Sequence, residues 1–257
     1  MPELVRSQKA HGIATITLDS PDNRNALSSA LIEQLLAALG AAEDDAEVRA
    51  IVLSHTGRVF CSGADLKETA AALANGATTP PAGRLGEALA AIWNSGKPVV
   101  ARVAGPARAG GLGLIAAADI ALCAADATFA FSEVRIGVIP AVISATVLPR
   151  LAPRAAAELY LTGETFDGPR AAEIGLVTAA VPADDLDAAV TRYTDALVRG
   201  APGALAGAKQ LLRRGCDIGA EIEALTALSI RYFGSPEGLE GVRAFREKRD
   251  ANWVPQG

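Results

Sequence analysis

The stretch Phe60-Cys61-Ser62-Gly63-Ala64-Asp65-Leu66-Lys67 decides the fold and the chemistry that we predict for this chain. A second stretch, Ala109-Gly110-Gly111-Leu112-Gly113, follows later in the sequence. Each contains a glycine-rich turn that can present a backbone N–H group. Two N–H groups that converge on one point form an oxyanion hole, which stabilises negative charge developing on a carbonyl oxygen. Together the two stretches predict a site that polarises a carbonyl group.

A third segment, Phe131 to Gly137, adds one carboxylate inside an apolar stretch. Because Glu133 has mostly apolar neighbours, we expect burial to raise its pKa toward the range of a general acid or base. Judged by these residues alone, a surface glutamate or an ion pair with Arg135 is the simpler interpretation. The chemistry predicted from all three segments is proton transfer next to a polarised carbonyl.

Composition limits the classes of function. The 257 residues allow one large domain or two small ones, and 50% of them are hydrophobic, which is enough for a sizeable core. The net charge of −5, with acidic and basic residues interspersed, argues against a nucleic-acid partner. This net charge is compatible with a phosphorylated ligand, since a few local basic residues suffice to bind one.

Cysteine and histidine give little support for other chemistry. The three cysteines, Cys61, Cys123 and Cys216, have no paired spacing, so we expect no disulfide framework. Cys61 is either a nucleophile beside the first turn or a small buried residue, and we favour the second interpretation. The only histidines, His11 and His55, are expected to be structural. No spacing suggests a metal site, so we expect no metal.

The chain shows no targeting or membrane signal. Its N-terminus lacks a basic region followed by an apolar stretch, so we expect no secretory signal. The apolar run from Ile115 to Ala125 is interrupted by Asp119 and is too short to span a bilayer. We therefore expect a cytoplasmic protein with no membrane partner.

Strands alternate with helices through most of the chain, which predicts an α/β fold with parallel pairing. A hairpin is expected over Leu4–Gln8 and Ile13–Leu18, and Ser28 is expected to cap a helix over residues 29–42. Further elements are predicted as strands over 49–54 and 98–103, helices over 84–93, 184–198, 202–213, 220–232 and 236–246, a turn feeding a helix over 63–74, and a mobile loop over 75–83. Because everything after about Asp184 is helical, we place a domain boundary near residue 198.

One motif predicts a different function. Gly111-Leu112-Gly113-Leu114-Ile115-Ala116 fits the G-x-G-x-x-A pattern of dinucleotide-binding proteins, with Glu133 twenty residues beyond Gly113. That pattern usually opens a domain, whereas here it lies in the middle of the chain. The same glycines are better explained as a close-approach turn with an N–H donor at a helix N-terminus.

The ordered set of motifs resembles the crotonase superfamily, the enoyl-CoA hydratases and isomerases. The matching segments cover nearly the whole chain: Asn23–Leu27, Gly63–Lys67, Lys97–Ala101, Gly110-Gly111 with Asp119-Ile120, Glu133–Pro140, Thr162–Glu164, Gly175–Val177 and Glu247–Arg249. The resemblance implies a spiral of ββα turns over residues 1–198 and a C-terminal helical region over 199–257. It also implies a homotrimer, or a dimer of trimers, built through those helices.

The resemblance also assigns roles to residues at matching positions. The N–H groups of Ala64 and Gly110 would form the oxyanion hole, and Glu133 would be the catalytic carboxyl group. An acyl-CoA thioester would be the substrate, with no further cofactor. The coenzyme A portion would contact the segments around the first turn, through Arg24, Ala26, Ser62, Ala64, Asp65, Leu66 and Lys67.

Gly113 departs from the family pattern. Many hydratases of the superfamily carry a second glutamate at this position, and the two carboxylates together hold the water. With one carboxylate, hydration or dehydration of an enoyl-CoA is still our first expectation, including branched or carboxylated substrates, for which Arg108 is a candidate carboxylate partner. Alternatives are double-bond isomerisation, other enolate chemistry such as decarboxylation or thioester hydrolysis, and non-catalytic acyl-CoA binding.

Overall fold

The main sheet of this computed structural model opens with the predicted hairpin. The structure describes residues 2–74, 84–215 and 217–255, so the loop expected over Asn75–Gly83 lies outside the described residues. Strands β1 (Val5–Ala10) and β2 (Ile13–Leu18) pair antiparallel across His11-Gly12, where both residues have positive φ. On β2, Ile16 and Leu18 are fully buried and alternate with less buried residues. The hairpin prediction is confirmed.

Parallel strands complete this sheet. Strand β3 (Ala50–His55) pairs with β2, and β4 (Val99–Val103), β6 (Ile120–Ala124) and β9 (Ala179–Val181) follow in the order β1-β2-β3-β4-β6-β9. Strand β3 is buried at every position, as expected of a parallel strand covered on both faces. The strands predicted over 49–54 and 98–103 are confirmed.

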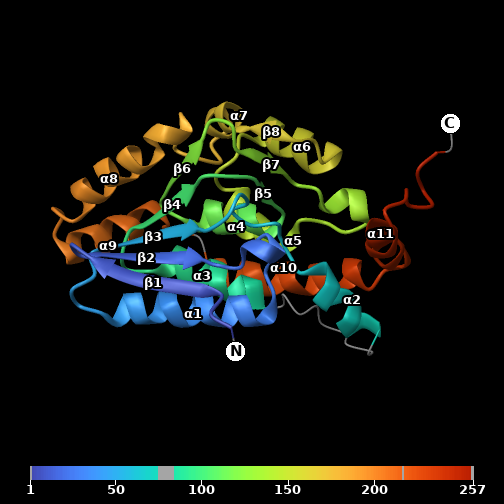
Figure 1. Cartoon of the computed structure of the whole chain (residues 1–257), viewed down its shortest axis with the longest axis horizontal. Coiled ribbons are helices and arrows are strands. Elements are labelled where there is room, and N and C mark those ends of the chain that lie inside the picture. Colours follow the sequence, from blue (N-terminus) through green and yellow to red (C-terminus); the bar gives the residue numbers. More distant parts are fainter. Residues whose placement is uncertain (1, 75–83, 216, 256–257) are drawn as a thin grey trace.

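A smaller sheet, ordered β5-β7-β8, contains β5 (Ala107–Arg108), β7 (Thr128–Ala130) and β8 (Phe166–Asp167). The chain passes from β4 to β5 to helix α4 (Gly110–Ala117), and then from β6 to β7 to α5 (Ala141–Val147). Each turn therefore adds one strand to each sheet and then a helix. This is the spiral of ββα turns that the resemblance implied, and Figure 1 shows the strands of the main sheet following one another from β1, low in the view, to β6, near its top.

Helices cover the main sheet. Helix α1 (Ser29–Asp44) packs on β1 and β2, and the Ser28 side chain caps it by accepting from Leu31 N. Figure 1 shows α1 below the strands and α8 above them. The other helices are α2 (Leu66–Ala74), α3 (Leu85–Asn94), α6 (Pro153–Thr162), α7 (Gly168–Glu173) and α8 (Leu186–Leu197), with short 3-10 turns η1 (Pro21–Asn23), η3 (Glu133–Ile136) and η4 (Ala183–Asp185).

The C-terminal region is helical, as predicted. It contains α9 (Pro202–Leu212), α10 (Ile218–Phe233) and α11 (Pro236–Glu247), whose ends differ from the predicted ones by at most two residues. Helix α10 packs against α3 and α5, and its Ile218 and Ile222 join the main hydrophobic core. Helix α10 thus packs against the two helices, α3 and α5, that flank α4. None of the described helices combines the length and apolar character that crossing a bilayer requires.

Candidate active site

The two glycine-rich turns meet. Short parallel bridges join Cys61 to Ala107 and Leu27 to Ala64, and Arg108 N donates to Cys61 O at 2.9 Å. The backbones then approach so closely that a Cβ built on Gly63 would lie only 3.6 Å from Gly110 N. Two segments far apart in the sequence therefore place their turns in contact, as an oxyanion hole requires.

The residues of both candidate donors, Ala64 and Gly110, line a cavity of about 80 Å³. Gly110 is the first residue of α4, where an N–H group has no intrahelical acceptor. Within residues 2–74, 84–215 and 217–255, neither N–H group donates a hydrogen bond. Ala109, which precedes Gly110, has φ +47° and ψ −118°, a conformation that costs energy for a residue with a Cβ. This strained residue sets the direction of the Gly110 N–H group.

Glu133 lines the same cavity from the first position of η3. Its exposed fraction is 8%, and burial among apolar groups raises the pKa of Glu133 to about 7. Its Oε2 atom is buried and bonded to none of the described residues. Arg135 instead donates to Thr162 O at 3.2 and 3.3 Å, so the surface and ion-pair interpretations of Glu133 are wrong.

Gly113 lies one helical turn beyond Gly110, and its side of α4 is closed by α5. A Cβ built on Gly113 would lie 2.6 Å from Ile143 Cγ2 and 3.3 Å from Leu89 Cδ2. Both distances are shorter than ordinary van der Waals contact. The space beside Gly113 is therefore already filled by Ile143, and no second carboxylate can enter it unless the Ile143 side chain is displaced or shortened.

Comparison with known proteins agrees with this geometry. The family model for enoyl-CoA hydratase/isomerase matches residues 8–256. The chain belongs to the enoyl-CoA hydratase/isomerase family. It is 37% identical to a Rhodobacter capsulatus protein named probable enoyl-CoA hydratase, over 97% of each chain. It is 32% identical to a carnitinyl-CoA dehydratase from Salmonella arizonae, over 98% of this chain and 99% of that protein.

A solved structure gives the same result for the fold. The crystal structure of an enoyl-CoA hydratase from Mycobacterium avium superposes with a TM-score of 0.87 at 44% identity, covering 99% of this chain and 100% of that one. The dinucleotide-binding interpretation of Gly111 and Gly113 is therefore wrong. These glycines serve close packing, since a Cβ on Gly111 would also collide with Cys61, at 2.9 Å from its Cβ.

The segments that the family resemblance assigns to coenzyme A lie side by side. Ser62 N donates to Arg24 O at 3.1 Å, and Leu27 N donates to Gly63 O at 2.8 Å. Arg24 and Lys67 are exposed, which leaves their cationic heads available to phosphates. Ala26 is buried, and Ser62, Ala64 and Leu66 are partly buried beside them.

Asp65 has a structural use. Its Oδ1 accepts from Lys67 N at 2.9 Å and Glu68 N at 3.1 Å, and its Oδ2 accepts from Asn23 Nδ2 at 2.9 Å. These bonds cap the start of α2 and fix the first turn against the Asn23 segment. A contact between Asp65 and coenzyme A would therefore involve its backbone.

Arg108 does not line the cavity. Its guanidinium donates to Ala107 O at 2.8 Å, to Thr128 O at 2.6 Å and to Thr128 Oγ1 at 3.0 Å. These hydrogen bonds connect β5 to β7, so the role of Arg108 is structural. Its guanidinium is therefore not available to bind a substrate carboxylate.

Cys61 and His55 are likewise structural. Cys61 is fully buried, and desolvation raises the pKa of its thiol to about 12, so the nucleophile hypothesis is wrong. His55 is buried, and its Nε2 accepts from Ala104 N at 3.0 Å. The described residues contain no group of three His, Cys, Asp or Glu side chains placed to hold a metal ion.

One wall of the cavity was not predicted from the sequence. Four residues of α10 line it, Thr226, Ser229, Ile230 and Phe233, opposite the family motifs. They occur more than ninety residues after Glu133 and form no local motif. Only the return of α10 to α3 and α5 brings them to the site, and that packing leaves no signal in a single sequence.

Proposed function

We propose that this protein hydrates enoyl-CoA thioesters with Glu133 as its single catalytic carboxyl group. The observation that carries this proposal is the buried, unbonded Oε2 of Glu133 in the cavity lined also by Ala64 and Gly110. Buried polar atoms without a partner are rare in native proteins, and they occur where a ligand or water completes the site. The relatives named enoyl-CoA hydratase and carnitinyl-CoA dehydratase support the same reaction class.

One carboxyl group can serve both halves of hydration. The Glu133 carboxylate accepts a proton from water while the hydroxide oxygen bonds to the β-carbon of the enoyl group. Electrons move onto the thioester oxygen, where the Ala64 and Gly110 N–H groups stabilise the enolate. The protonated Glu133 then delivers its proton to the α-carbon. One water is added and Glu133 returns to its starting state; a pKa of about 7 suits both steps.

The acyl group that fits this cavity is uncharged. Apart from Glu133, no lining residue is ionisable, and the wall is built of side chains such as Leu85, Val142, Ile143 and Phe233. The residues outside the description contain no Lys, Arg or His, so they supply no side-chain cation either. Burying a substrate carboxylate here, next to the carboxyl of Glu133, would be costly. We therefore favour straight or branched hydrocarbon acyl groups over carboxylated ones.

The first experiment is to incubate the purified protein with crotonyl-CoA, following loss of the conjugated thioester absorbance and identifying products by mass. Gain of one water supports the hydratase. The second candidate is a double-bond isomerase, which the single carboxylate also permits. Conversion of a β,γ-unsaturated thioester without a mass change, and no hydration, would favour it. Binding of the thioesters without turnover of either kind would contradict both enzymes.

Substrate choice is tested with glutaconyl-CoA, which carries a terminal carboxylate. We expect kcat/KM for crotonyl-CoA to exceed that for glutaconyl-CoA by about 100-fold or more, because the cavity offers the carboxylate no cation. Equal values would contradict the uncharged-substrate proposal while leaving hydration intact.

We also propose that the chain assembles through its C-terminal helices, as the resemblance implied. Helix α9 exposes Leu211 at 68% and Leu212 at 86%, and α11 exposes Phe245 at 55%. Exposed apolar side chains of this size mark association surfaces. Light scattering should give three or six times the chain mass of 26.2 kDa, and a monomer would contradict the proposal.

A further inference from the structure

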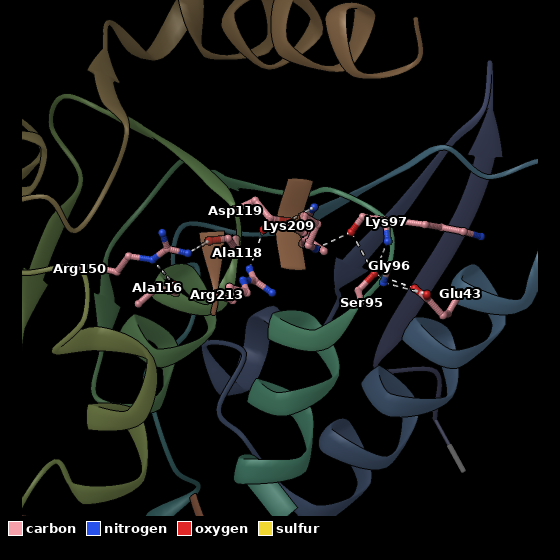
Figure 2. Close-up of polar contacts among 11 residues, drawn as sticks. Glu43, Ser95, Gly96, Lys97, Ala116, Ala118, Asp119, Arg150, Lys209 and Arg213 are labelled. Atoms are coloured by element: carbon pink, nitrogen blue, oxygen red, sulfur yellow. Dashed lines mark hydrogen bonds and ion pairs between the residues drawn. The ribbon is translucent and has the colours of Figure 1, made fainter. Parts of the chain in front are cut away.

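A second cavity lies away from the catalytic one, beside a cluster of charged side chains that we call the Asp119 cluster: Asp119, Arg150, Lys209 and Arg213. Figure 2 shows these residues meeting between the ends of several helices. Asp119 forms two ion pairs: its Oδ2 lies 2.7 Å from Lys209 Nζ, and its Oδ1 lies 2.6 Å from Arg213 Nη2. One negative charge therefore serves two cations.

Arg150 adds a third cation to this cluster. Its Nε donates to Ala116 O at 3.2 Å and its Nη2 donates to Ala118 O at 3.1 Å, which caps the C-terminal end of α4. Among the described carboxylates, none forms an ion pair with Arg150. Its guanidinium lies 5.1 Å from the centre of the Trp93 ring, and that of Arg213 lies 4.4 Å from the same ring. The buried Trp93 thus holds two guanidinium groups near each other.

Among the described residues, positive charge exceeds negative charge at this place. The side chains of Lys209 and Arg213 are only 9% and 11% exposed, so water screens them little. Glu43 also acts on Lys209, but its oxygens accept from Ser95 Oγ at 2.7 Å and Gly96 N at 2.9 Å. Within the described part of the chain, the carboxylates that act on these three cations are Asp119 and Glu43.

The neighbouring cavity has a volume of about 190 Å³ and is lined by Trp93, Asp119, Pro149, Arg150, Leu212, Arg213 and Arg214. Three of these residues are arginines. Guanidinium groups bind phosphate and carboxylate through paired hydrogen bonds, and buried unbalanced charge favours a bound counter-ion. We propose that this cavity is a binding site for a small dissolved oxyanion, of the phosphate class, held by Arg150, Arg213 and Arg214.

The site lies at the far ends of two helices that begin at the catalytic cavity. Leu85 lines the catalytic cavity and Trp93 lines the second one, so about 12 Å of α3 separates them. Helix α4 likewise starts at Gly110 and ends at the carbonyl groups that Arg150 caps. An anion can therefore occupy this place without competing with an acyl-CoA, and its binding is independent of the proposed reaction.

The test is thermal unfolding of the full-length protein in inorganic phosphate, against sodium chloride of equal ionic strength. Saturating coenzyme A is present throughout, so that phosphate contacts near Arg24 and Lys67 are occupied. At a tenfold excess of phosphate over its Kd, we expect the melting temperature to rise by about 3 to 6 °C. Titration calorimetry should give one phosphate per chain.

Two variants locate the binding. Arg150→Met and Arg214→Gln should each reduce the phosphate-dependent rise, and Arg154→Gln, an exposed arginine outside the cavity, should keep it. Because Arg150 also caps α4, Arg150→Met can prevent folding. In that case Arg214→Gln, at an exposed position, tests the site on its own. A wild-type protein that responds equally to phosphate and chloride overturns the proposal. The proposal is also overturned if phosphate does not stabilise the protein and Arg150→Met dissociates an oligomer of the wild type. The cations would then bind a carboxylate of a second copy of the chain.

Discussion

Replacing Glu133 by Gln should make the protein more stable at alkaline pH. Gln has the shape of a protonated glutamate but never ionises. In the native protein burial raises the pKa of Glu133 to about 7, from an ordinary value of 4.5 in the unfolded chain. At about 1.36 kcal/mol per pKa unit, keeping this carboxylate ionised in the folded protein costs roughly 3 kcal/mol.

The sign follows from proton binding. Between pH 4.5 and about 7 the folded protein holds a proton on Glu133 that the unfolded chain has lost, so this group lowers the free energy of unfolding as pH rises and has no further effect above 7. Between pH 5.5 and 8.5 the loss amounts to about 2 kcal/mol. The Gln variant lacks it, so its stability relative to wild type should rise by that amount.

Urea unfolding at fixed protein concentration measures the difference, because other titrations cancel between wild type and variant. The pH range stays above the isoelectric point of about 5.2, where precipitation would interfere. Glu164→Gln, at an exposed position, is the matched control for loss of one carboxylate. A difference between Glu133→Gln and wild type that stays constant from pH 5.5 to 8.5 would refute the buried, protonated carboxyl group.

Three further predictions concern other walls of the site. Gly113→Ala should lower the free energy of unfolding by about 1–2 kcal/mol through collision with Ile143. In a double-mutant cycle Ile143→Ala, which deletes the colliding Cγ2, should remove most of that cost, and strictly additive effects would contradict the contact. Ala64→Pro, which lacks an N–H group, should lower kcat about 100- to 1000-fold while Ala64→Gly, which keeps that group, retains most activity, and full turnover by a folded Pro variant would disprove the oxyanion hole. Phe233→Ala should raise kcat/KM for an eight-carbon enoyl-CoA relative to crotonyl-CoA about tenfold, whereas the exposed Glu223→Ala should not; an unchanged ratio would remove α10 from the acyl wall.

The sequence allowed prediction of those parts of the structure that local patterns determine. Ser28 as a helix cap, the hairpin at His11-Gly12 and the buried run of β3 all depend on neighbouring residues, and all were found. The two glycine-rich turns predicted an oxyanion hole, but its donors and the role of Glu133 were assigned through the family resemblance, because a lone glutamate is more simply explained by a surface position.

Long-range packing could not be predicted in this way. The strain at Ala109, the filling of the Gly113 side by Ile143 and the return of α10 to the cavity all depend on contacts between distant segments. Arg108 shows the same limit: its position suggested a substrate contact, and only the structure reveals that Thr128 accepts its hydrogen bonds. Single-sequence patterns specify which elements form better than which of their side chains meet.

The contact between Gly113 and Ile143 has an evolutionary consequence. If glutamate appeared at position 113 first, the intermediate protein would have a collision at 2.6 Å with Ile143. If Ile143 were shortened first, the intermediate protein would have a cavity beside Gly113. Either order lowers the free energy of unfolding before the second carboxylate can contribute. The effects of substitutions at the two positions on stability are therefore coupled, and a second carboxylate at position 113 requires both positions to change.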